Sequence, residues 1–555
     1  MLTIHPGASA REISAVIRTA PENAVVFFTP GEYYLDQAIE VLGKRGLTLA
    51  GDNAVLRPHF DRAALCGECA ADAFHAAPTP DAEVMRLENC EGLILRGLTV
   101  NADAPANSEC RVLRIGPDYV EVRVNSSLPF RGDELFISGL GITEEGVNLD
   151  QWWVNAPFDP ARRTLIADEV PCTAPMRQPV RTEYLGDQAF RVYTAAIPSG
   201  LKPGARLTVQ HTYYGLCAFT FRNCREVTVE DVRISNFGGF GFIILPRCEN
   251  FIFRRLRLQT EDPVRQPNCL NSDGIHITGL TGRIRLEDCY FEFPGDDCLN
   301  LHGQVMLVTW AGEGRARIRY DKICGSISPD WARPGDRMRV WNQADLSMRE
   351  VALAHIAPVR TQAGTILEAE LTFAQPIALQ AGDYISNGEY YPALELERCT
   401  VKNQRGRAFC IQSTDRLTIR DCTFLNVASP ALYLSTAVEY WYEAGPVSNA
   451  VIEGCRFEAF TGKKAGRMDG AILARVNSRH PGVSHVHRNI TIKNCSFEGR
   501  FAPRAIGLNA VDGVILKDNQ FTEKDNRIEM NNCHGVEISA QDPVHILLSD
   551  ENLQP

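Results

Sequence analysis

The sequence has no cluster of lysine and arginine residues, and its 57 basic residues are outnumbered by 68 acidic ones, for a formal net charge of −11. Nucleic acids and anionic membranes attract proteins through concentrated positive charge, so neither partner is expected. Long hydrophobic runs are absent as well, since no stretch approaches the roughly 18 uncharged apolar residues that a membrane span needs. The sequence therefore predicts a soluble protein that binds no nucleic acid and no membrane.

The N-terminal residues lack the basic segment and following apolar run of a secretion signal. A cytoplasmic location is therefore favoured, and the 18 cysteines agree with a reducing compartment. A secreted protein is the alternative if the sequence begins after a leader. Zinc-finger spacing is also missing, because Cys66 and Cys69 form the only close pair and no second Cys or His pair matches it. We expect a thiol-containing loop there, and neither a metal nor another cofactor.

What the sequence does contain is a repeat. Residues 223–234 and 247–258 align at an offset of 24 residues, with apolar residues at alternate positions on both sides of a two-residue gap. Alternation predicts β-strands, and the gap predicts a bend between two strands. Related segments begin at Leu93, Ile284, Leu394, Leu417, Ala450, Ile490 and Val514. After the gap many copies place a cysteine, expected as a small apolar core residue: Cys289, Cys399, Cys422, Cys455 and Cys495.

Another short apolar strand lies between successive copies, as at 242–244, 275–277 and 299–301. One coil of about 24 residues then contributes strands to parallel sheets, and stacked coils place equivalent side chains in ladders. A β-sandwich or a propeller would not keep one such register. The sequence predicts an all-β fold, a right-handed parallel β-helix, with the hand taken from the usual chirality of parallel crossovers.

Two breaks in the register divide the chain. We expect inserted domains at 111–212 and 305–389, each a small antiparallel β-barrel or sandwich, because both contain short alternating strands and Gly-Asp turns. The remaining parts are an N-terminal cap with the first coils at 1–110, central coils at 213–304 and C-terminal coils at 390–555. An amphipathic pattern at 8–20 predicts a helix that caps the open end of the solenoid.

The most unusual pair of coils carries three aspartates. The segments NSDGIHI (271–277) and GDDCLNL (295–301) align at the offset of 24, which places Asp273 one coil from Asp297 and Asp296 beside it. Carboxylates this close repel one another, so one holds its proton while another stays ionised. Acid-base hydrolysis requires that asymmetry, since one group protonates the leaving oxygen and another activates water. The alternatives are a solvated acidic patch and a calcium site.

Polar side chains around these aspartates are candidates for substrate binding. With the isoleucines and leucines of both segments pointing inward, His276, Asn300 and His302 are expected on an outer sheet face. Arg407 lies in the column of the aspartates, where its cation favours an ionised carboxylate or holds a substrate hydroxyl. In the segment VEYWYEAGP (438–446), aromatic residues form a platform for a sugar ring or pack beneath the loop. The full candidate set is Asn271, His276, Asn300, His302, Arg407, Trp441 and Glu443, with Tyr440 and Tyr442 as further aromatic candidates.

With these residues the sequence resembles glycoside hydrolase family 110, whose members are α-1,3-galactosidases acting on terminal galactose. The resemblance covers most of the chain, including the DGIH segment at Asp273, the DD-x-x-N-x-HG segment from Asp296 to Gly303 and the WYEAG loop at Trp441. It implies a capped β-helix with two barrel-like insertions and an inverting mechanism without a cofactor. It also implies that Asp296 is the acid and that Asp273 and Asp297 are the base pair that positions water.

Polygalacturonases, which are also inverting β-helix enzymes, share part of the pattern. Asn271-Ser272-Asp273 and Gly295-Asp296-Asp297 are similar to their N-T-D and G-D-D segments, but the later G-H-G and R-I-K segments are missing from the coils that follow. A galacturonate carboxylate needs such cations nearby.

We therefore expect an exo-acting hydrolase that removes terminal α-1,3-linked galactose from an oligosaccharide or glycan. A polygalacturonase-like hydrolase of another glycan, a non-catalytic carbohydrate-binding β-helix and a calcium-dependent lyase are the alternatives. A homo-oligomer is compatible with a solenoid face or an insert as an interface.

Overall fold

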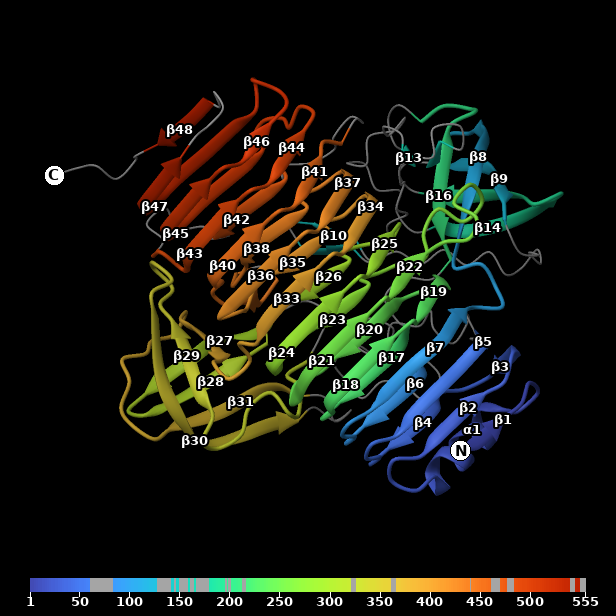
Figure 1. Cartoon of the computed structure of the whole chain (residues 1–555), viewed down its shortest axis with the longest axis horizontal. Helices are drawn as coiled ribbons and strands as arrows, with labels where there is room; N and C mark the ends of the chain where they lie inside the picture. Colours follow the sequence, from blue (N-terminus) through green and yellow to red (C-terminus); the bar gives the residue numbers. More distant parts are fainter. Residues whose placement is uncertain are drawn as a thin grey trace.

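The coils form a long solenoid of parallel strands (Figure 1). The computed structural model describes residues 1–59, 83–126, 179–194, 197, 201–211, 216–320, 326–360, 366–439, 441–460, 470–476, 484–539 and 545–549, and four short strands between 141 and 165. Cys66 and Cys69, with the loop predicted there, lie outside the described residues. Three ladders of parallel strands run along the solenoid, which confirms the predicted β-helix.

The first ladder carries the short strands that precede each repeat segment. Its members are β4 (Ile39–Leu42), β6 (Glu83–Glu88), β17 (Cys217–Arg222), β20 (Phe240–Ile244), β23 (Ile275–Ile277), β26 (Leu299–Leu301), β35 (Phe409–Ile411), β38 (Leu432–Thr436), β42 (Ile472–Val476), β45 (Ile506–Lys517), β47 (Arg527–Ser539) and β48 (His545–Ser549).

The second ladder contains the strands before the bend of the repeat, and it also joins the first coils to the rest. Its members are β1 (Leu2–Ile4), β2 (Val25–Phe28), β5 (Thr48–Pro58), β7 (Ile94–Asn101), β18 (Arg225–Glu230), β21 (Cys248–Arg254), β24 (Leu280–Glu287), β33 (Ala393–Glu397), β36 (Arg416–Arg420), β40 (Ser448–Glu453) and β43 (His487–Lys493), followed by the second half of β45.

The third ladder contains the strands after the bend. Its members are β3 (Gly31–Leu35), the later parts of β5 and β7, β19 (Arg233–Asn236), β22 (Arg257–Gln259), β25 (Tyr290–Glu292), β34 (Thr400–Gln404), β37 (Thr423–Val427), β41 (Arg456–Glu458), β44 (Ser496–Glu498) and β46 (Gln520–Phe521).

The open N-terminal end is covered by α1 (Ala10–Thr19), as predicted. Ser9 and Glu12 form a capping box that satisfies the first free N–H groups of the helix. The side chains of Ile13 and Ile17 are buried on the face that packs against β4. Within the described part of the chain no helix has the length and apolarity to cross a bilayer.

Inside the solenoid, equivalent side chains stack from coil to coil. The five cysteines after the bend are all buried, and the 14 described cysteines form no disulfide with one another. Beside them Phe424, Phe457, Phe497 and Phe521 lie in one column, with successive ring centroids 4.7–5.0 Å apart and nearly parallel. Each ring therefore supports its two neighbours, which makes the column a continuous part of the core.

Removing one ring from this column should destabilise the C-terminal coils. Phe457→Ala leaves a cavity between two rings, and we expect it to lower the free energy of unfolding by about 3–5 kcal/mol. Hydrogen exchange of the amides in β41 and β44 measures this loss. Ile515→Ala on β45 is the control, because 39% of that residue is exposed to solvent and its loss should be much smaller. Equal losses in both variants would contradict the stacked column.

Two antiparallel units interrupt the solenoid. The first is a five-stranded sheet in the order β14 (Pro179–Gly186), β15 (Ala189–Thr194), β9 (Tyr119–Asn125), β8 (Asn107–Ile115) and β16 (Arg206–Gln210), accompanied by the hairpins β10 (Gly141–Thr143) with β11 (Gly146–Asn148) and β12 (Phe158–Asp159) with β13 (Thr164–Leu165). The second is a closed six-stranded barrel of β27 (Gly303–Gly312), β28 (Arg315–Arg319), β31 (Ile366–Phe373), β30 (Met348–Arg360), β29 (Arg337–Trp341) and β32 (Tyr384–Asn387).

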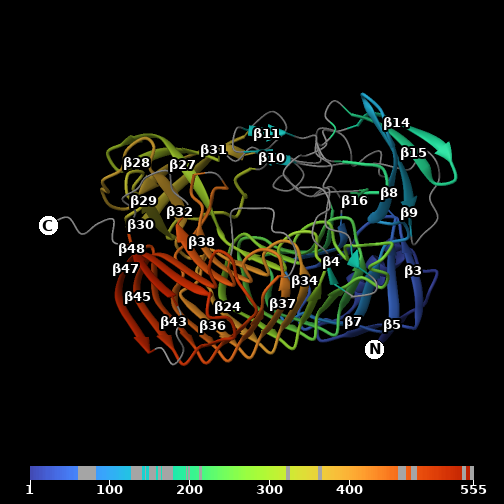
Figure 2. The ribbon, with the colours of Figure 1, turned by 90° about the horizontal axis from the view of Figure 1, so that it is seen from above.

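Both units stand on the same side of the solenoid, toward opposite ends of its length (Figure 2). The short strand β39 (Glu443–Ala444) adds to the barrel by pairing with β27. The predicted boundaries of the inserted domains stay a prediction. The coils between the two units are the ones that carry the aspartates.

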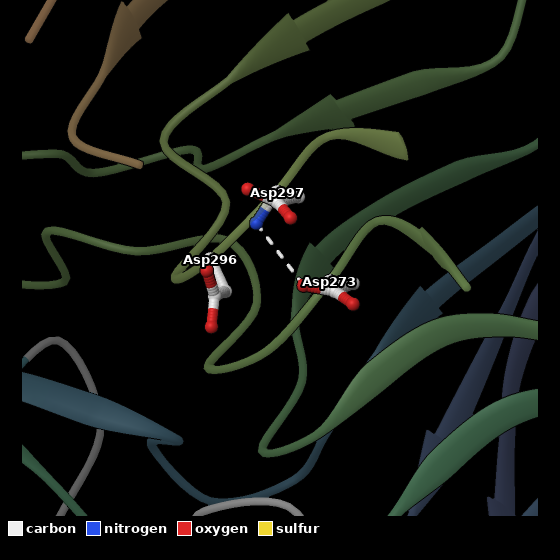
Figure 3. Close-up of side chains that lie close together, drawn as sticks. All are labelled: Asp273, Asp296 and Asp297. Atoms are coloured by element: carbon white, nitrogen blue, oxygen red, sulfur yellow. Dashed lines mark hydrogen bonds between the residues drawn. The ribbon is translucent and has the colours of Figure 1, made fainter. Parts of the chain in front are cut away.

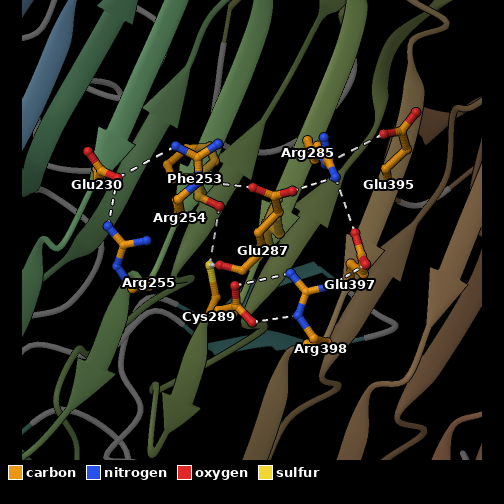
Figure 4. Close-up of polar contacts among 12 residues, drawn as sticks. Glu230, Phe253, Arg254, Arg255, Arg285, Glu287, Cys289, Glu395, Glu397 and Arg398 are labelled. Carbon is orange, nitrogen blue, oxygen red and sulfur yellow. Dashed lines mark hydrogen bonds and ion pairs between the residues drawn. The ribbon is translucent and has the colours of Figure 1, made fainter.

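The outer face of the second ladder carries charged side chains of alternating sign (Figure 4). Glu287 accepts from Arg254 at 2.9 Å and also contacts Arg285, and Arg398 donates twice to Asp288. Most of these groups are substantially exposed, so the individual pairs contribute little to stability. Exposed ion pairs of this kind are ordinary surface contacts, and the aspartate cluster differs from them.

Candidate active site

The register around the aspartates agrees with the offset of 24. Strands β23 and β26 pair Ile275 with Leu299 and His276 with Asn300. The aliphatic side chains of this pair of strands are buried in the solenoid core. His276 and Asn300 therefore stand on the outer face of the first ladder, as the alternation predicts.

The turns before these strands come unusually close together. A Cβ atom on Gly295 would lie 2.5 Å from the carbonyl carbon of Asn271, and one on Gly274 would lie 2.5 Å from the carbonyl oxygen of Cys298. Larger residues at these glycines would push the coils apart. The two glycines thus bring the turn of Asp273 against the turn of Asp296 and Asp297.

Figure 3 shows the three aspartates gathered around these turns. One oxygen of each carboxyl group lies within 4.8 Å of the others, and the backbone N–H of Asp297 donates to Oδ1 of Asp273 at 3.1 Å. Asp297 is fully buried and Asp273 is 4% exposed, whereas Asp296 is half-buried. Of the three carboxyl groups, Asp296 is thus the most accessible to a ligand.

Arg407, whose side chain is 22% exposed, forms an ion pair with the fully buried Asp297. Its Nε and Nη2 atoms donate to the two carboxylate oxygens at 2.7 and 2.6 Å, and its guanidinium lies 5.5 Å from the ring centre of Tyr433. Burial raises the pKa of the Asp297 carboxyl, and the guanidinium opposes this shift. The carboxylate that Arg407 was predicted to favour in its ionised form is therefore that of Asp297.

Asp273 is bound by His276. Its Oδ2 lies 2.7 Å from Nδ1 of the imidazole, while its Oδ1 accepts from the Asp297 amide. Burial first, and then the charge of Asp296, raise the pKa of Asp273 well above the ordinary range of a carboxyl group. Asp273 and Asp297 are therefore both buried but differ in partner, since one faces an imidazole and the other a guanidinium.

A second histidine continues from the first. His302 Nε2 lies 3.3 Å from Nε2 of His276 and 3.7 Å from Oε1 of Glu443. Glu443 is buried, and its other oxygen accepts from Gln412 at 2.9 Å. Glu443 is placed beside His302 because β39 pairs with β27 of the barrel. The barrel is thus connected to the aspartates through Glu443, His302 and His276.

Asn271 and Asn300 have different surroundings. Asn271 is fully buried, donates to the carbonyl oxygen of Ala106 at 2.8 Å and accepts from Asn107 at 3.0 Å, which ties the turn of the aspartates to β8. Asn300 is 5% exposed, and its Oδ1 is buried with no hydrogen-bond partner among the described residues. Contact of either side chain with a substrate stays a prediction.

The aromatic loop packs partly against the barrel. Tyr442 is buried in the barrel core, edge-on to Tyr320 and Tyr384, so this ring packs rather than forming a platform. Trp441 is half-buried, and Tyr440 lies outside the described residues. Trp441 thus stays the candidate for contact with a sugar.

Oxygen ligands of three carboxylates suit a hard cation such as Ca²⁺. Here, however, both oxygens of Asp297 are engaged by Arg407, and one oxygen of Asp273 faces His276. A cation at this position would lie close to a guanidinium. The surroundings of the trio therefore favour acid-base chemistry over metal binding.

Three polar residues near the aspartates were not predicted. Gln412 follows β35 one coil beyond His302, so extending the column by one coil could have found it. Gln404 donates to the backbone carbonyl of Asp296 from the third ladder. Asn107 comes from the first inserted unit, 164 residues before Asn271, and no pattern in the sequence indicates that contact.

Known proteins support the fold and the resemblance. A family model described as "Right handed beta helix region" matches residues 359–502. The chain is 22% identical over 464 residues to alpha-1,3-galactosidase B of Akkermansia muciniphila, covering 81% of this chain and 56% of that protein. It is 21% identical over 484 residues to alpha-1,3-galactosidase B of Bacteroides thetaiotaomicron, covering 82% and 74%. A family 28 exopolygalacturonase structure from Yersinia enterocolitica aligns at 10% identity and a TM-score of 0.43, covering 99% of this chain and 77% of that chain.

The length of these relatives differs from that of the chain. The match covers 56% and 53% of the two Akkermansia muciniphila proteins and 42% of alpha-1,3-galactosidase A of Peterkaempfera griseoplana, so the chain spans about half the length of these relatives. The predicted resemblance to α-1,3-galactosidases is confirmed over most of the chain. The chain is a right-handed parallel β-helix that is similar, over about four fifths of its length, to proteins named alpha-1,3-galactosidase.

Proposed function

We propose that this protein is a glycoside hydrolase that removes terminal α-1,3-linked galactose from an oligosaccharide or glycan. The observation that carries the proposal is the aspartate trio, in which three carboxyl groups meet at one-coil spacing in three different environments. The galactose specificity rests on the similarity to the α-1,3-galactosidases. Arg407 is occupied by Asp297, which leaves it less suited to a galacturonate carboxylate and weighs against a polygalacturonase.

Asp296 acts as the acid in this proposal, because it is the half-buried member of the trio. It gives its proton to the leaving oxygen as the bond from that oxygen to the anomeric carbon breaks. Asp273 is the base, which takes a proton from the water whose oxygen bonds to the anomeric carbon. Arg407 binds both carboxylate oxygens of Asp297 and so fixes this residue. The backbone N–H of Asp297 donates to Asp273 and thereby orients the turn. Solvent then restores the proton of Asp296 and removes that of Asp273.

The stereochemical outcome tests the inverting mechanism. Acid and base of inverting glycosidases usually stand about 6.5–9.5 Å apart, and the nearest oxygens of this trio are closer, within 4.8 Å. We nevertheless expect inversion, following the resemblance, so that proton NMR of the earliest product detects β-galactose. Initial release of α-galactose would contradict inversion and indicate a covalent intermediate.

A panel of aryl α- and β-glycosides, followed by a Galα1-3Gal disaccharide, tests the substrate class. We expect turnover of the α-galactosides alone, at the same rate with and without a chelator. A non-catalytic carbohydrate-binding β-helix would bind without turnover. Loss of activity with the chelator, together with an unsaturated product, would instead indicate a calcium-dependent lyase.

A further inference from the structure

We propose that His276 is a positioning residue that holds a proton beside Asp273, so that Asp273 stays a carboxylate and can serve as the base. The inference rests on the proposed function for its catalytic consequence, whereas the proton itself is inferred from the hydrogen bonds and from the greater basicity of an imidazole. It assigns His276 and His302 a role other than contact with the sugar. Three observations carry it.

The first observation fixes the tautomer of His302. Its Nδ1 lies 3.3 Å from the carbonyl oxygen of Gly303, and a carbonyl can only accept a hydrogen bond, so Nδ1 carries the hydrogen. In a neutral imidazole the other nitrogen, Nε2, then has a lone pair. That lone pair faces Nε2 of His276 at 3.3 Å, so the His276 nitrogen must donate.

The second observation concerns the remaining nitrogen of His276. Nδ1 lies 2.7 Å from Oδ2 of Asp273, so one proton lies between these two atoms, while Oδ1 accepts from the Asp297 amide. An imidazolium beside a carboxylate and a neutral imidazole beside a carboxylic acid both satisfy these contacts. An imidazole has the higher ordinary pKa, about 6.5 against about 3.9, which favours the proton on His276. The ring is fixed in this orientation by edge-on contacts with Phe240 and with the ring of His302.

The third observation is the balance of charge around the pair. Burial, Asp296 and Glu443 raise the pKa of Asp273, whereas Arg407 and the Asp297 amide lower it. The imidazole 2.7 Å away is a base that can take up the proton of this carboxyl group. Glu443, 3.7 Å from Nε2 of His302, supplies a negative charge that favours a cation on the paired imidazoles.

The variant His276→Asn tests the proposal, because an amide nitrogen can replace the Nδ1 donor but cannot hold the extra proton. We expect the acidic limb of the kcat/KM profile to move to higher pH by about one unit or more, with activity recovering at that higher pH. His302→Leu removes the acceptor of His276 and should move the limb the same way, whereas His302→Gln keeps an acceptor and should restore it. His534→Asn, at an exposed histidine on β47, is the control and should change nothing.

The pH profile separates the alternatives. A uniform loss of kcat at every pH would indicate a merely structural role, and a rise in KM with an unmoved limb would indicate a sugar ligand; either result would overturn the proposal.

A second measurement does not depend on activity. Nitrogen-15 NMR of histidine-labelled wild-type protein should detect, at neutral pH, a buried imidazole protonated at both nitrogens next to one protonated at Nδ1 alone. The signals are assigned by their loss in His276→Asn, or by their perturbation in His302→Gln if the first variant does not fold. An unprotonated Nδ1 on His276 would disprove the inference even if the protein cleaves galactosides. If the protein cleaves no glycoside, the NMR result still decides where the proton lies.

Discussion

Asp296→Asn should lower kcat by about 10²- to 10⁴-fold and leave thermal stability nearly unchanged, because a positioned general acid contributes that factor to the rate. The amide has a similar shape but cannot release a proton to the leaving oxygen. The stability should persist since the Asp296 side chain is half-buried and the hydrogen bond to Gln404 uses the backbone carbonyl. Steady-state kinetics on the Galα1-3Gal disaccharide and thermal unfolding measure the two quantities.

The choice of substrate sharpens this experiment. An aryl leaving group of low pKa needs little protonation, so the variant should lose much less activity on a nitrophenyl galactoside than on the disaccharide. Asp288→Asn, on the exposed outer face where the side chain pairs with Arg398, is the matched control and should retain full activity. Unchanged turnover of the disaccharide by Asp296→Asn would remove this residue from the acid role.

Removing the partner of Asp297 should strongly destabilise the protein. Arg407→Leu leaves a fully buried carboxylate without its cation, and breaking such a pair typically costs about 3–5 kcal/mol. We expect a loss of that size in the free energy of unfolding, measured by urea denaturation, together with loss of activity because the turn of the aspartates is no longer held. The double variant Asp297→Asn with Arg407→Leu should recover part of the stability and none of the activity.

The chain offers a close control for this change. Arg398 also binds an aspartate through two nitrogens, at 2.7 and 3.1 Å, but this pair with Asp288 is 47% and 43% exposed. Arg398→Leu should therefore cause little measurable change in stability. If the two arginine variants were equally stable, the buried pair would not organise the site as described.

Much of the fold and part of the site could be predicted from the sequence. The 24-residue register placed Asp273 beside Asp297, and His276 beside Asn300, because parallel coils pair residues at a constant offset. The inward cysteines followed from the same alternation. Such inferences succeed where contacts connect equivalent positions of neighbouring repeats.

The partners from the inserted units could not be predicted in this way. Asn107 reaches Asn271 from β8, and Glu443 reaches His302 because β39 pairs antiparallel with β27. Neither contact repeats along the chain, so no periodicity indicates it. Tyr442 illustrates the same limit, since only the barrel core decides that its ring is buried.

By itself, the sequence determined the solenoid, its register and the convergence of three aspartates, since all of these follow from a local pattern repeated at one period. Only the tertiary structure decided how the three carboxyl groups differ in burial and in the groups that they contact. Asp273 faces an imidazole 2.7 Å away, Asp297 pairs with a guanidinium 110 residues later in the chain, and Asp296 is only half-buried. Charge states are set by burial and by distances of a few ångströms, and these exist only once the coils have stacked.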